Sequence, residues 1–258
     1  MLAISAHTRA QTVTNAAATL GVPLPPAFLE KVDQAERFTE AAKETVCTKE
    51  KLHAAVLSAI EEGRDYHADK GIQRLALDCQ LTSQNILAAA RSRGEELVTA
   101  ALNDHADDIL DGWSDALDEH SAHLVAAAEA GLNLKDASGA VARGVDTMRQ
   151  LHAAQIAVKA WAAAEHGFHT LAAVAGVRIN ATGTVALTPA RLAELAPAYE
   201  LARDERTEVN AWILSRCGIV LRLATLDEFT RRAAQLRADT EAEARDRAAR
   251  TNAAGFNR

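Results

Sequence analysis

Residues 65–132 carry the longest regular pattern in the sequence, and this segment constrains the fold more than any other. Apolar or neutral side chains recur mostly at steps of three, four or seven residues, which places them along one stripe of an α-helix. No proline interrupts the segment. A continuous helix of this length would extend about 100 Å at 1.5 Å per residue, so it needs partner helices to cover its stripe. The stripe consists of Ile72, Leu75, Cys79, Ile86, Ala90, Leu97, Ala101, His105, Ile109, Trp113, Ala116, His120, Leu124 and Ala127.

The predicted fold is mainly α: an elongated antiparallel helical bundle or coiled coil with one very long central helix and a small β-hairpin. Alanine accounts for 58 of the 258 residues, and aromatic residues for only 4%. Alanine strongly favours helix but buries little area, which suits rods and bundles better than enzymes with deep pockets. Thr82-Ser83 and Gly94 are weak points of the central helix. A break near residue 82 or 94 would divide it into shorter stacked helices.

Four segments are distinguished along the chain. The helical bundle contains a central hairpin, because the helix stop at Gly131 and Asn133 leaves only a short connection before the next helical pattern. Residues 65–131 are therefore expected to pack antiparallel to residues 136–175. The segments are an N-terminal helix with a proline-rich connector (1–26), the helical bundle (27–175), a small α+β element (176–224) and a charged C-terminal helix with a flexible tail (225–258).

The hydrophobic period changes after Gly176. Residues 177–179 and 184–187 are predicted to form the two strands of a β-hairpin, because a glycine-containing turn separates two short β-prone runs. Residues 219–223 are consistent with either a third strand or a helix. Further on, Thr225 and Glu228 match a capping box that opens the last helix.

The charge of the chain is unevenly distributed. The net charge is −7, yet the segment from Gly94 to Leu134 holds ten acidic residues and no Lys or Arg. Such a block repels nucleic acid and anionic membranes, so neither is expected as a partner. Five of these acids form one stripe, which we call the acidic ladder: Asp104, Asp108, Asp111, Asp115 and Asp118.

Two interpretations of the acidic ladder remain open. Like charges at helical spacing destabilise a helix by about 0.2–0.5 kcal/mol per pair, so a compensating contact would be favourable. The ladder is either a solvated face that aids solubility or a docking face for a basic protein partner.

Histidines accompany carboxylates at two places. Glu119-His120-Ser-Ala-His123 and Glu165-His166-Gly-Phe-His169 share the pattern E-H-x-x-H, and a Glu and a His four residues apart lie on the same face of a helix. A divalent metal could be bound in the central hairpin, and the alternative is a set of interface histidines hydrogen-bonded to carboxylates. The candidate metal ligands are His105, Asp108, His166 and His169.

The sequence has few large aromatic side chains that could anchor a helix interface, and few cysteines. Trp113 and Trp161 are the predicted anchors of a helix interface, and we expect self-association because an alanine-rich rod has few bulky residues to cover its stripe. The cysteines Cys47, Cys79 and Cys217 are widely spaced, which favours reduced thiols in a cytoplasmic setting. The first residues lack the basic n-region and the apolar h-region of a signal peptide, so none is expected there, and no apolar run approaches membrane-spanning length.

The sequence predicts a non-enzymatic helical protein that acts as a scaffold, an assembly subunit or a chaperone-like subunit. Proteins of virus and phage particle assembly often have this general organisation, which is an analogy of form only. Glycine-rich phosphate loops and the motifs G-x-S-x-G and H-E-x-x-H are absent. The alternative is a metal-binding bundle, either an enzyme or a metal carrier, that uses the histidine–carboxylate cluster; no other cofactor is predicted.

Overall fold

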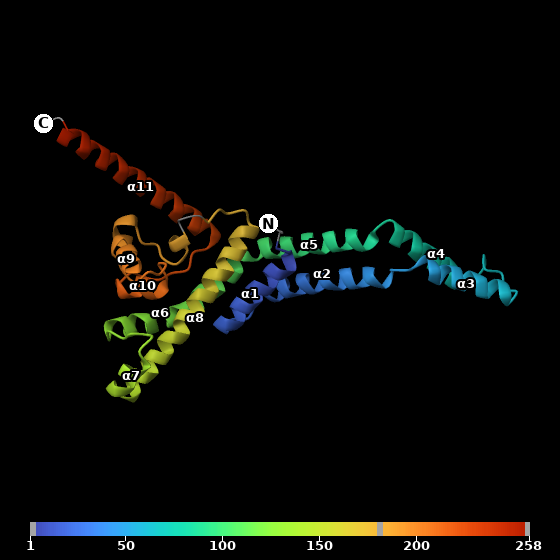
Figure 1. Ribbon diagram of the computed structural model, residues 1–258, viewed down its shortest axis with the longest axis horizontal. Coiled ribbons are helices and arrows are strands. Elements are labelled where there is room, and N and C mark those ends of the chain that lie inside the picture. Colours follow the sequence, from blue (N-terminus) through green and yellow to red (C-terminus); the bar gives the residue numbers. More distant parts are fainter. Residues whose placement is uncertain (1–3, 180–182, 256–258) are drawn as a thin grey trace. The chain divides into compact units, whose positions relative to one another are not determined.

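The computed structural model describes residues 4–179 and 183–255, and these contain eleven α-helices, one short 3₁₀-helix and no strand (Figure 1). The prediction of a mainly α fold with antiparallel helix packing is confirmed. The chain divides into two compact units: unit 1 comprises residues 1–10 and 26–102, and unit 2 comprises residues 11–25 and 103–258. The helices are α1 (Ala6–Leu20), α2 (Pro26–Glu44), α3 (Lys49–Glu61), α4 (Lys70–Ser83), α5 (Ile86–Asp104), α6 (Ala106–Glu129), α7 (Ala137–Arg143), α8 (Val145–Val174), α9 (Leu192–Asp204), α10 (Ala211–Arg216) and α11 (Leu226–Gly255).

Unit 1 is dominated by an arm two helices thick, which comprises residues 26–102. In the arm, α2 lies beside α5, and α3 packs against α4 (Figure 1). Side chains fix where its helices begin: Thr48 accepts a hydrogen bond from the Lys51 amide, and Asp69 accepts bonds from the amides of Gly71 and Ile72. These caps satisfy amides that the helices themselves leave unpaired.

The arm has a thin core made largely of small side chains. Gly94 of α5 lies so close to α2 that an added Cβ would stand 2.7 Å from the Thr39 Oγ1. Unit 1 also includes the first turn of α1, where the Glu95 carboxylate accepts a hydrogen bond from the Ala6 amide and contacts the His7 Nδ1 at 3.0 Å. The buried apolar residues of the arm are Phe28, Ala35, Cys47, Ala59, Ile72, Ala90, Val98, Ala101 and Leu102.

The predicted single long helix over residues 65–132 is wrong, because three helices, α4, α5 and α6, occupy this segment. The first break, at residues 84–85, lies next to the weak point at residue 82, and Asn85 adopts a left-handed φ of 58° there. Asparagine tolerates this conformation better than most residues. The second break, at His105, has no glycine or proline to signal it, and Gly94 lies inside α5 without interrupting it.

Unit 2 is built on the pairing of α6 with α8. An added Cβ on Gly167 of α8 would stand 2.4 Å from the Trp113 ring of α6, and the Gln150 Nε2 donates to the Ala126 carbonyl at 2.9 Å. Residues late in α8 therefore contact residues early in α6, and residues early in α8 contact residues late in α6, so the two helices are antiparallel. The predicted hairpin is confirmed for these two helices, with α7 in the connection and Gly144, at a φ of 107°, before α8.

The predicted β-hairpin is wrong for the part that the structure describes. Residues 183–186 form a 3₁₀-helix, residues 177–179 and 219–223 lie in neither strand nor helix, and the expected turn at 180–182 falls outside the described residues. The apolar run is buried by other means. The amides of Arg222 and Ala224 donate to the carbonyls of Leu187 and Ala186 at 2.8 and 2.9 Å.

The partly buried guanidinium of Arg232 links the segments of this irregular region. Arg232 of α11 donates to the carbonyls of Val185 and Arg222 at 3.1 and 3.0 Å, and it pairs with Glu228 at 3.0 Å. Burial lowers the pKa of Arg232 and the nearby Glu228 opposes that shift. Because one side chain satisfies two carbonyls, the segments stay together without a regular ladder.

No helix in residues 4–179 and 183–255 is long and apolar enough to cross a membrane.

Candidate functional site

The acidic ladder is exposed along its whole length. Four of its members, beginning at Asp108, lie on α6, while Asp104 closes α5 on the other side of the break at His105. Asp108 lies 3.6 Å from the His105 Nδ1. Among the described residues, no basic side chain forms an ion pair with Asp111, Asp115 or Asp118. Asp107, which is not part of the ladder, accepts a hydrogen bond from the Leu226 amide at the start of α11.

The proposed metal ligands are not brought together. No group of three or more His, Cys, Asp or Glu side chains in the described part of the chain has a geometry that could hold a metal ion. His105 and Asp108 are neighbours, whereas His166 is exposed and His169 faces a different part of unit 2. The E-H-x-x-H pattern does place Glu165 and His169, four residues apart, along the same cleft. In the other E-H-x-x-H sequence, on α6, the Glu119 carboxylate lies 3.7 Å from the His123 Nε2.

Trp113 and Trp161, two of the three tryptophans, anchor packing within the chain. Trp113 is fully buried and Trp161 is only 2% exposed, and both belong to unit 2. Trp113 lies directly against the backbone of Gly167. Because their rings are already covered, neither offers surface to a second molecule.

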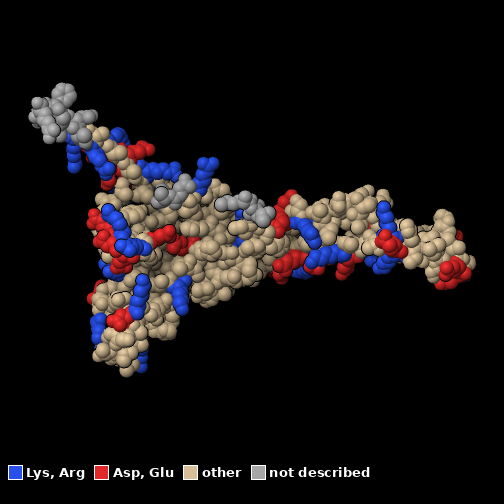
Figure 2. All heavy atoms as spheres, in the orientation of Figure 1, with Lys and Arg blue, Asp and Glu red and all other residues tan. Residues whose placement is uncertain are grey.

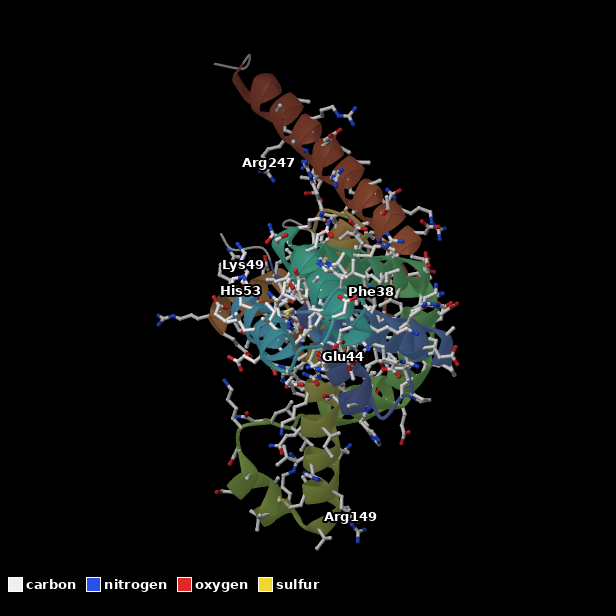
Figure 3. The ribbon with its side chains drawn as sticks, turned by 90° about the vertical axis from the view of Figure 1, so that its right-hand side faces the viewer. Phe38, Glu44, Lys49, His53, Arg149 and Arg247 are labelled. Carbon is white, nitrogen blue, oxygen red and sulfur yellow. The ribbon has the colours of Figure 1, made fainter. Side chains whose placement is uncertain are left out.

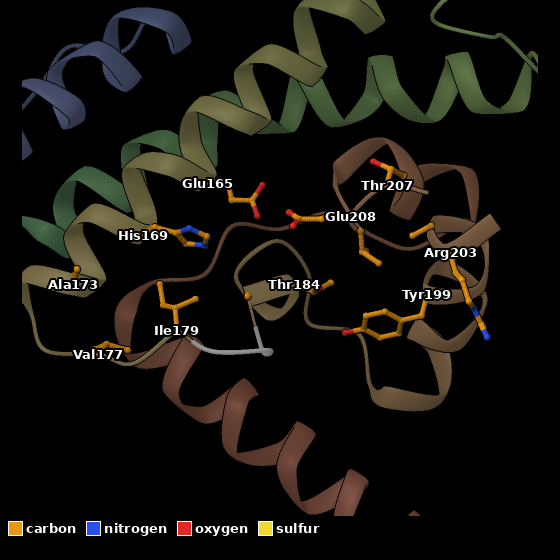
Figure 4. Close-up of a pocket in the computed structure, with 13 residues that line it drawn as sticks. Glu165, His169, Ala173, Val177, Ile179, Thr184, Tyr199, Arg203, Thr207 and Glu208 are labelled. Carbon is orange, nitrogen blue, oxygen red and sulfur yellow. The ribbon is translucent and has the colours of Figure 1, made fainter. Parts of the chain in front are cut away.

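A cleft of about 750 Å³ opens in unit 2 between α8, the segment after it and α9. Glu165 and His169 enter it from α8, Tyr199 enters from α9, and Glu208 enters from the segment before α10 (Figure 4). Glu165 and Glu208 point toward one another across this space. The sequence reasoning noted Glu165 and His169 as a pair but missed Tyr199 and Glu208, which come from elements that no spacing rule connects to α8.

The environment of the cleft disfavours charge on its α8 side. Burial raises the pKa of Glu165, and the charge of Glu208 raises it further. Burial lowers the pKa of His169, with a smaller contribution from His166. The buried Nε2 of His169 has no hydrogen-bond partner among the described residues. These groups could accept or donate hydrogen bonds and attract a cation, but they contain no nucleophile paired with a base.

A second concave surface lies on the arm between α3 and α4, and we call it the groove. Its volume is about 700 Å³, and it is mostly apolar. Aliphatic side chains of both helices form its walls, with Tyr66, His53 and His67 at the border. The aliphatic and small residues that line it are Leu52, Val56, Leu57, Ile72 and Ala76.

Large apolar side chains are exposed on the arm both in the groove and elsewhere. Leu57, Ile60 and Leu77 are 59%, 54% and 55% exposed. Phe38 of α2 is exposed as well, and it lies apart from His53 of α3 in the end-on view of the arm in Figure 3. On the face drawn in Figure 2, charged side chains gather along α2, whereas the surface along α5 is mostly uncharged. The remaining exposed apolar residues of the arm are Leu29 and Val46.

Sequence reasoning overlooked this surface for a physical reason. A stripe of apolar residues identifies the face that a helix tends to bury, but the stripe does not say whether the fold supplies enough partners to cover it. On the arm, α2 lies beside α5 and α3 packs against α4, with the first turn of α1 added beside Glu95, and part of each stripe therefore stays in contact with solvent.

Comparisons of this chain with protein-family models, with curated proteins and with solved structures found no match.

Proposed function

We propose that the protein is a non-enzymatic helical assembly protein whose arm pairs with the arm of a second copy. The observation that carries the proposal is the apolar groove between α3 and α4, with Leu57 exposed in it and Ile60 and Leu77 exposed on the same two helices. Pairing two such arms would give a four-helix arrangement in which each stripe gains a second neighbour. A two-fold axis would place the same groove on both sides of the contact.

The charge pattern of the arm favours a second copy as the occupant. Basic and acidic side chains alternate along it, as in the pairs Lys43–Glu40 and Arg93–Glu96. A surface with both signs can meet its own copy without strong repulsion. The acidic ladder differs in this respect, because a face with one sign of charge repels its own copy.

The acidic ladder is therefore assigned to a different partner. We propose that it docks a basic protein segment, as its exposure and the absence of ion pairs at Asp111, Asp115 and Asp118 in the described residues support. A scaffold or assembly subunit would then combine self-association through the arm with recruitment through the ladder.

The test replaces exposed apolar residues of the arm by charged ones. In the double variant Leu57→Glu/Leu77→Glu, burying two carboxylates at the contact would carry a large desolvation cost. We expect the wild type to sediment as a dimer at about 50 µM, and the double variant to dissociate with a dimerisation constant weaker by at least about 100-fold. Circular dichroism checks that helix content is unchanged, as expected for substitutions at exposed positions.

Val145→Glu is the matched control. Val145 is 67% exposed and lies at the start of α8 in unit 2, so its replacement introduces the same charge at a similarly exposed position that is not part of the arm. The control variant should remain a dimer. A wild type that stays monomeric at this concentration, or a double variant that dimerises as well as the control, would refute the proposal.

A further inference from the structure

Two cysteines far apart in the sequence meet inside the arm. Cys79 of α4 directs its thiol to Cys47, with the two Sγ atoms 2.9 Å apart, and the Cys79 Sγ also lies 3.4 Å from the Thr48 carbonyl oxygen. Both cysteines are free thiols. Cys47 is buried, whereas Cys79 is partly accessible. The remaining cysteine, Cys217, belongs to unit 2.

The thiol pair lies where both sides of the arm are interrupted. One side breaks between Glu44 and Lys49, where α2 ends and α3 begins, and the other breaks at residues 84–85, between α4 and α5. The two breaks lie side by side (Figure 1). Thr82 connects them, because its Oγ1 accepts a hydrogen bond from the Cys47 amide at 3.0 Å and donates one to the Asp78 carbonyl at 2.8 Å. We call this paired interruption the joint.

The joint interrupts the helical hydrogen bonding on both sides of the arm. No α-helical hydrogen bond continues across either break, and the helices beyond the joint, α3 and α4, carry the groove. The orientation of the groove relative to α2 and α5 therefore depends on the backbone of the joint. A covalent link across the joint would restrict that orientation.

We propose that Cys47 and Cys79 form a reversible disulfide in exchange with a small-molecule disulfide such as oxidised glutathione, and that this bond locks the joint of the arm. The inference is independent of whether two arms pair. Closing a bond of about 2.05 Å from the present sulfur separation needs a movement of less than about 1 Å.

The chemistry proceeds by two exchanges. The Cys79 thiolate, from the more accessible residue, attacks one sulfur of glutathione disulfide, which forms a protein–glutathione mixed disulfide and releases one glutathione thiolate. Cys47, as its thiolate, then attacks the Cys79 sulfur, which forms the intrachain disulfide and releases the second glutathione. The two protein thiols lose two electrons and two protons, and one glutathione disulfide is reduced to two thiols.

The surroundings of Cys79 make the first exchange slow at neutral pH. The hydrogen bond to Cys47, burial, and the negative charges of Asp78 and Glu50 raise the pKa of Cys79 to about 11. The reactive thiolate is then a minor species at pH 7, and its population grows about tenfold per pH unit up to that pKa. Formation of the disulfide should accelerate accordingly between pH 7 and pH 9.

The test treats the full-length protein with glutathione disulfide under nitrogen and digests it with trypsin. We expect one linked pair of peptides, residues 44–49 with residues 75–91, while Cys217 stays outside this bond. A dithiol reductant should separate the pair. Hydrogen exchange at the amides of residues 45–48 and 83–86 should slow by about tenfold in the oxidised protein, because the link suppresses opening of the joint.

Three serine variants complete the experiment. Cys217→Ser is the matched control and should form the linked peptides at the wild-type rate. Cys47→Ser should stop at the mixed disulfide on Cys79, and Cys79→Ser should not give the linked pair. Separate glutathione adducts on both cysteines of the wild type, disulfides between molecules, or unchanged hydrogen exchange at the joint after oxidation would each overturn the proposal.

Discussion

The arm and unit 2 are both built of helices, but they differ in how far their large apolar side chains are covered. Of the twelve largest fully buried side chains among the described residues, ten belong to unit 2, and only Phe28 and Leu102 belong to unit 1. The arm instead leaves Phe38, Leu57 and Leu77 about half exposed. A helix therefore needs more than an apolar stripe to become part of a core, because the stripe must also meet several neighbours.

The difference in how fully apolar side chains are covered also affects how each region responds to substitutions in its core. Unit 2 places two indoles and two phenylalanine rings in its core, with the rings of Phe168 and Phe229 at 5.2 Å. Such side chains bury a large area and tolerate little alteration in volume. The arm buries mainly alanine, glycine and valine positions between its helices, so each of its contacts contributes less.

The largest expected effect is the loss of an indole from unit 2. Trp113→Ala should lower the free energy of unfolding by about 3–5 kcal/mol, because it removes a fully buried ring and leaves a cavity. Leu57→Ala on the arm should change it by less than about 0.5 kcal/mol in the monomer. Urea denaturation followed by circular dichroism, at concentrations low enough to keep the protein monomeric, measures both. Similar decreases in the free energy of unfolding of the two variants would show that the arm and unit 2 do not differ in this respect.

A pair of glycines tests how tightly α6 and α8 pack. An added Cβ on Gly167 would stand 2.4 Å from the Trp113 ring, whereas one on Gly112 would meet only Val22 at 3.7 Å. Gly167→Ala should therefore destabilise by about 1–3 kcal/mol through overpacking, despite the higher helix propensity of alanine. Gly112→Ala should stabilise by about 0.5–1 kcal/mol. Thermal unfolding of the two variants should shift in opposite directions, and a stabilising Gly167→Ala would show that the Trp113 ring has room to move.

How far the sequence predicts the structure depends on whether the information is local. The stripe through Ile109, Trp113 and Leu124 is periodic, so it predicts the buried face of α6 correctly. The alternating run at 184–187 resembles a strand, yet tertiary contacts from Arg222 and Arg232 hold it in another conformation. The break at His105 leaves no local signal because histidine is compatible with a helix interior.

The candidate functional surfaces also differ in whether a local sequence pattern predicts them. Helical spacing alone predicts that Asp108, Asp111 and Asp115 share a face and that Glu165 and His169 share another, but it does not predict the cleft beside the second pair. The approach of Cys47 to Cys79 depends instead on two turns and a helix reversal, none of which a one-dimensional pattern specifies. The incomplete coverage of the arm likewise depends on the number of neighbouring helices.

The acidic ladder gives a smaller effect and separates its two interpretations. Replacing Asp111, Asp115 and Asp118 by Asn removes three like-charged neighbours and should stabilise the protein by about 1 kcal/mol at low salt. Asp108 is retained because it lies near His105 and in the first turn of α6, where a negative charge is favourable. A docking function further predicts weaker retention of basic proteins and a flatter salt dependence in a pull-down. Unchanged retention together with the gain in stability would leave the ladder as a solvated face.

The smallest expected effect concerns the cleft of unit 2 and its dependence on pH. The raised pKa of Glu165, caused by burial and then by Glu208, means that the native protein holds this proton more tightly than the unfolded chain. The stability contributed by Glu165 is therefore complete below the unfolded value near 4.3 and is lost as the pH rises through the raised native pKa. Glu165→Gln should raise the melting temperature by about 1 °C at pH 7.5 and leave it unchanged at pH 4.

His169 provides the internal reference for this experiment. Because burial lowers its pKa, its contribution is present above the unfolded value near 6.5 and is lost as the pH falls through the lower native pKa, which is the opposite sign. The Glu165→Gln variant should still lose the stability that His169 contributes as the pH falls. It should no longer lose stability as the pH rises, because residue 165 then carries no ionisable group. Melting temperatures measured from pH 4 to pH 8 separate the effect of His169 at low pH from the effect of Glu165 at high pH. An equal shift at every pH would mean that the substitution acts through packing, and that charge on Glu165 carries no cost in the cleft.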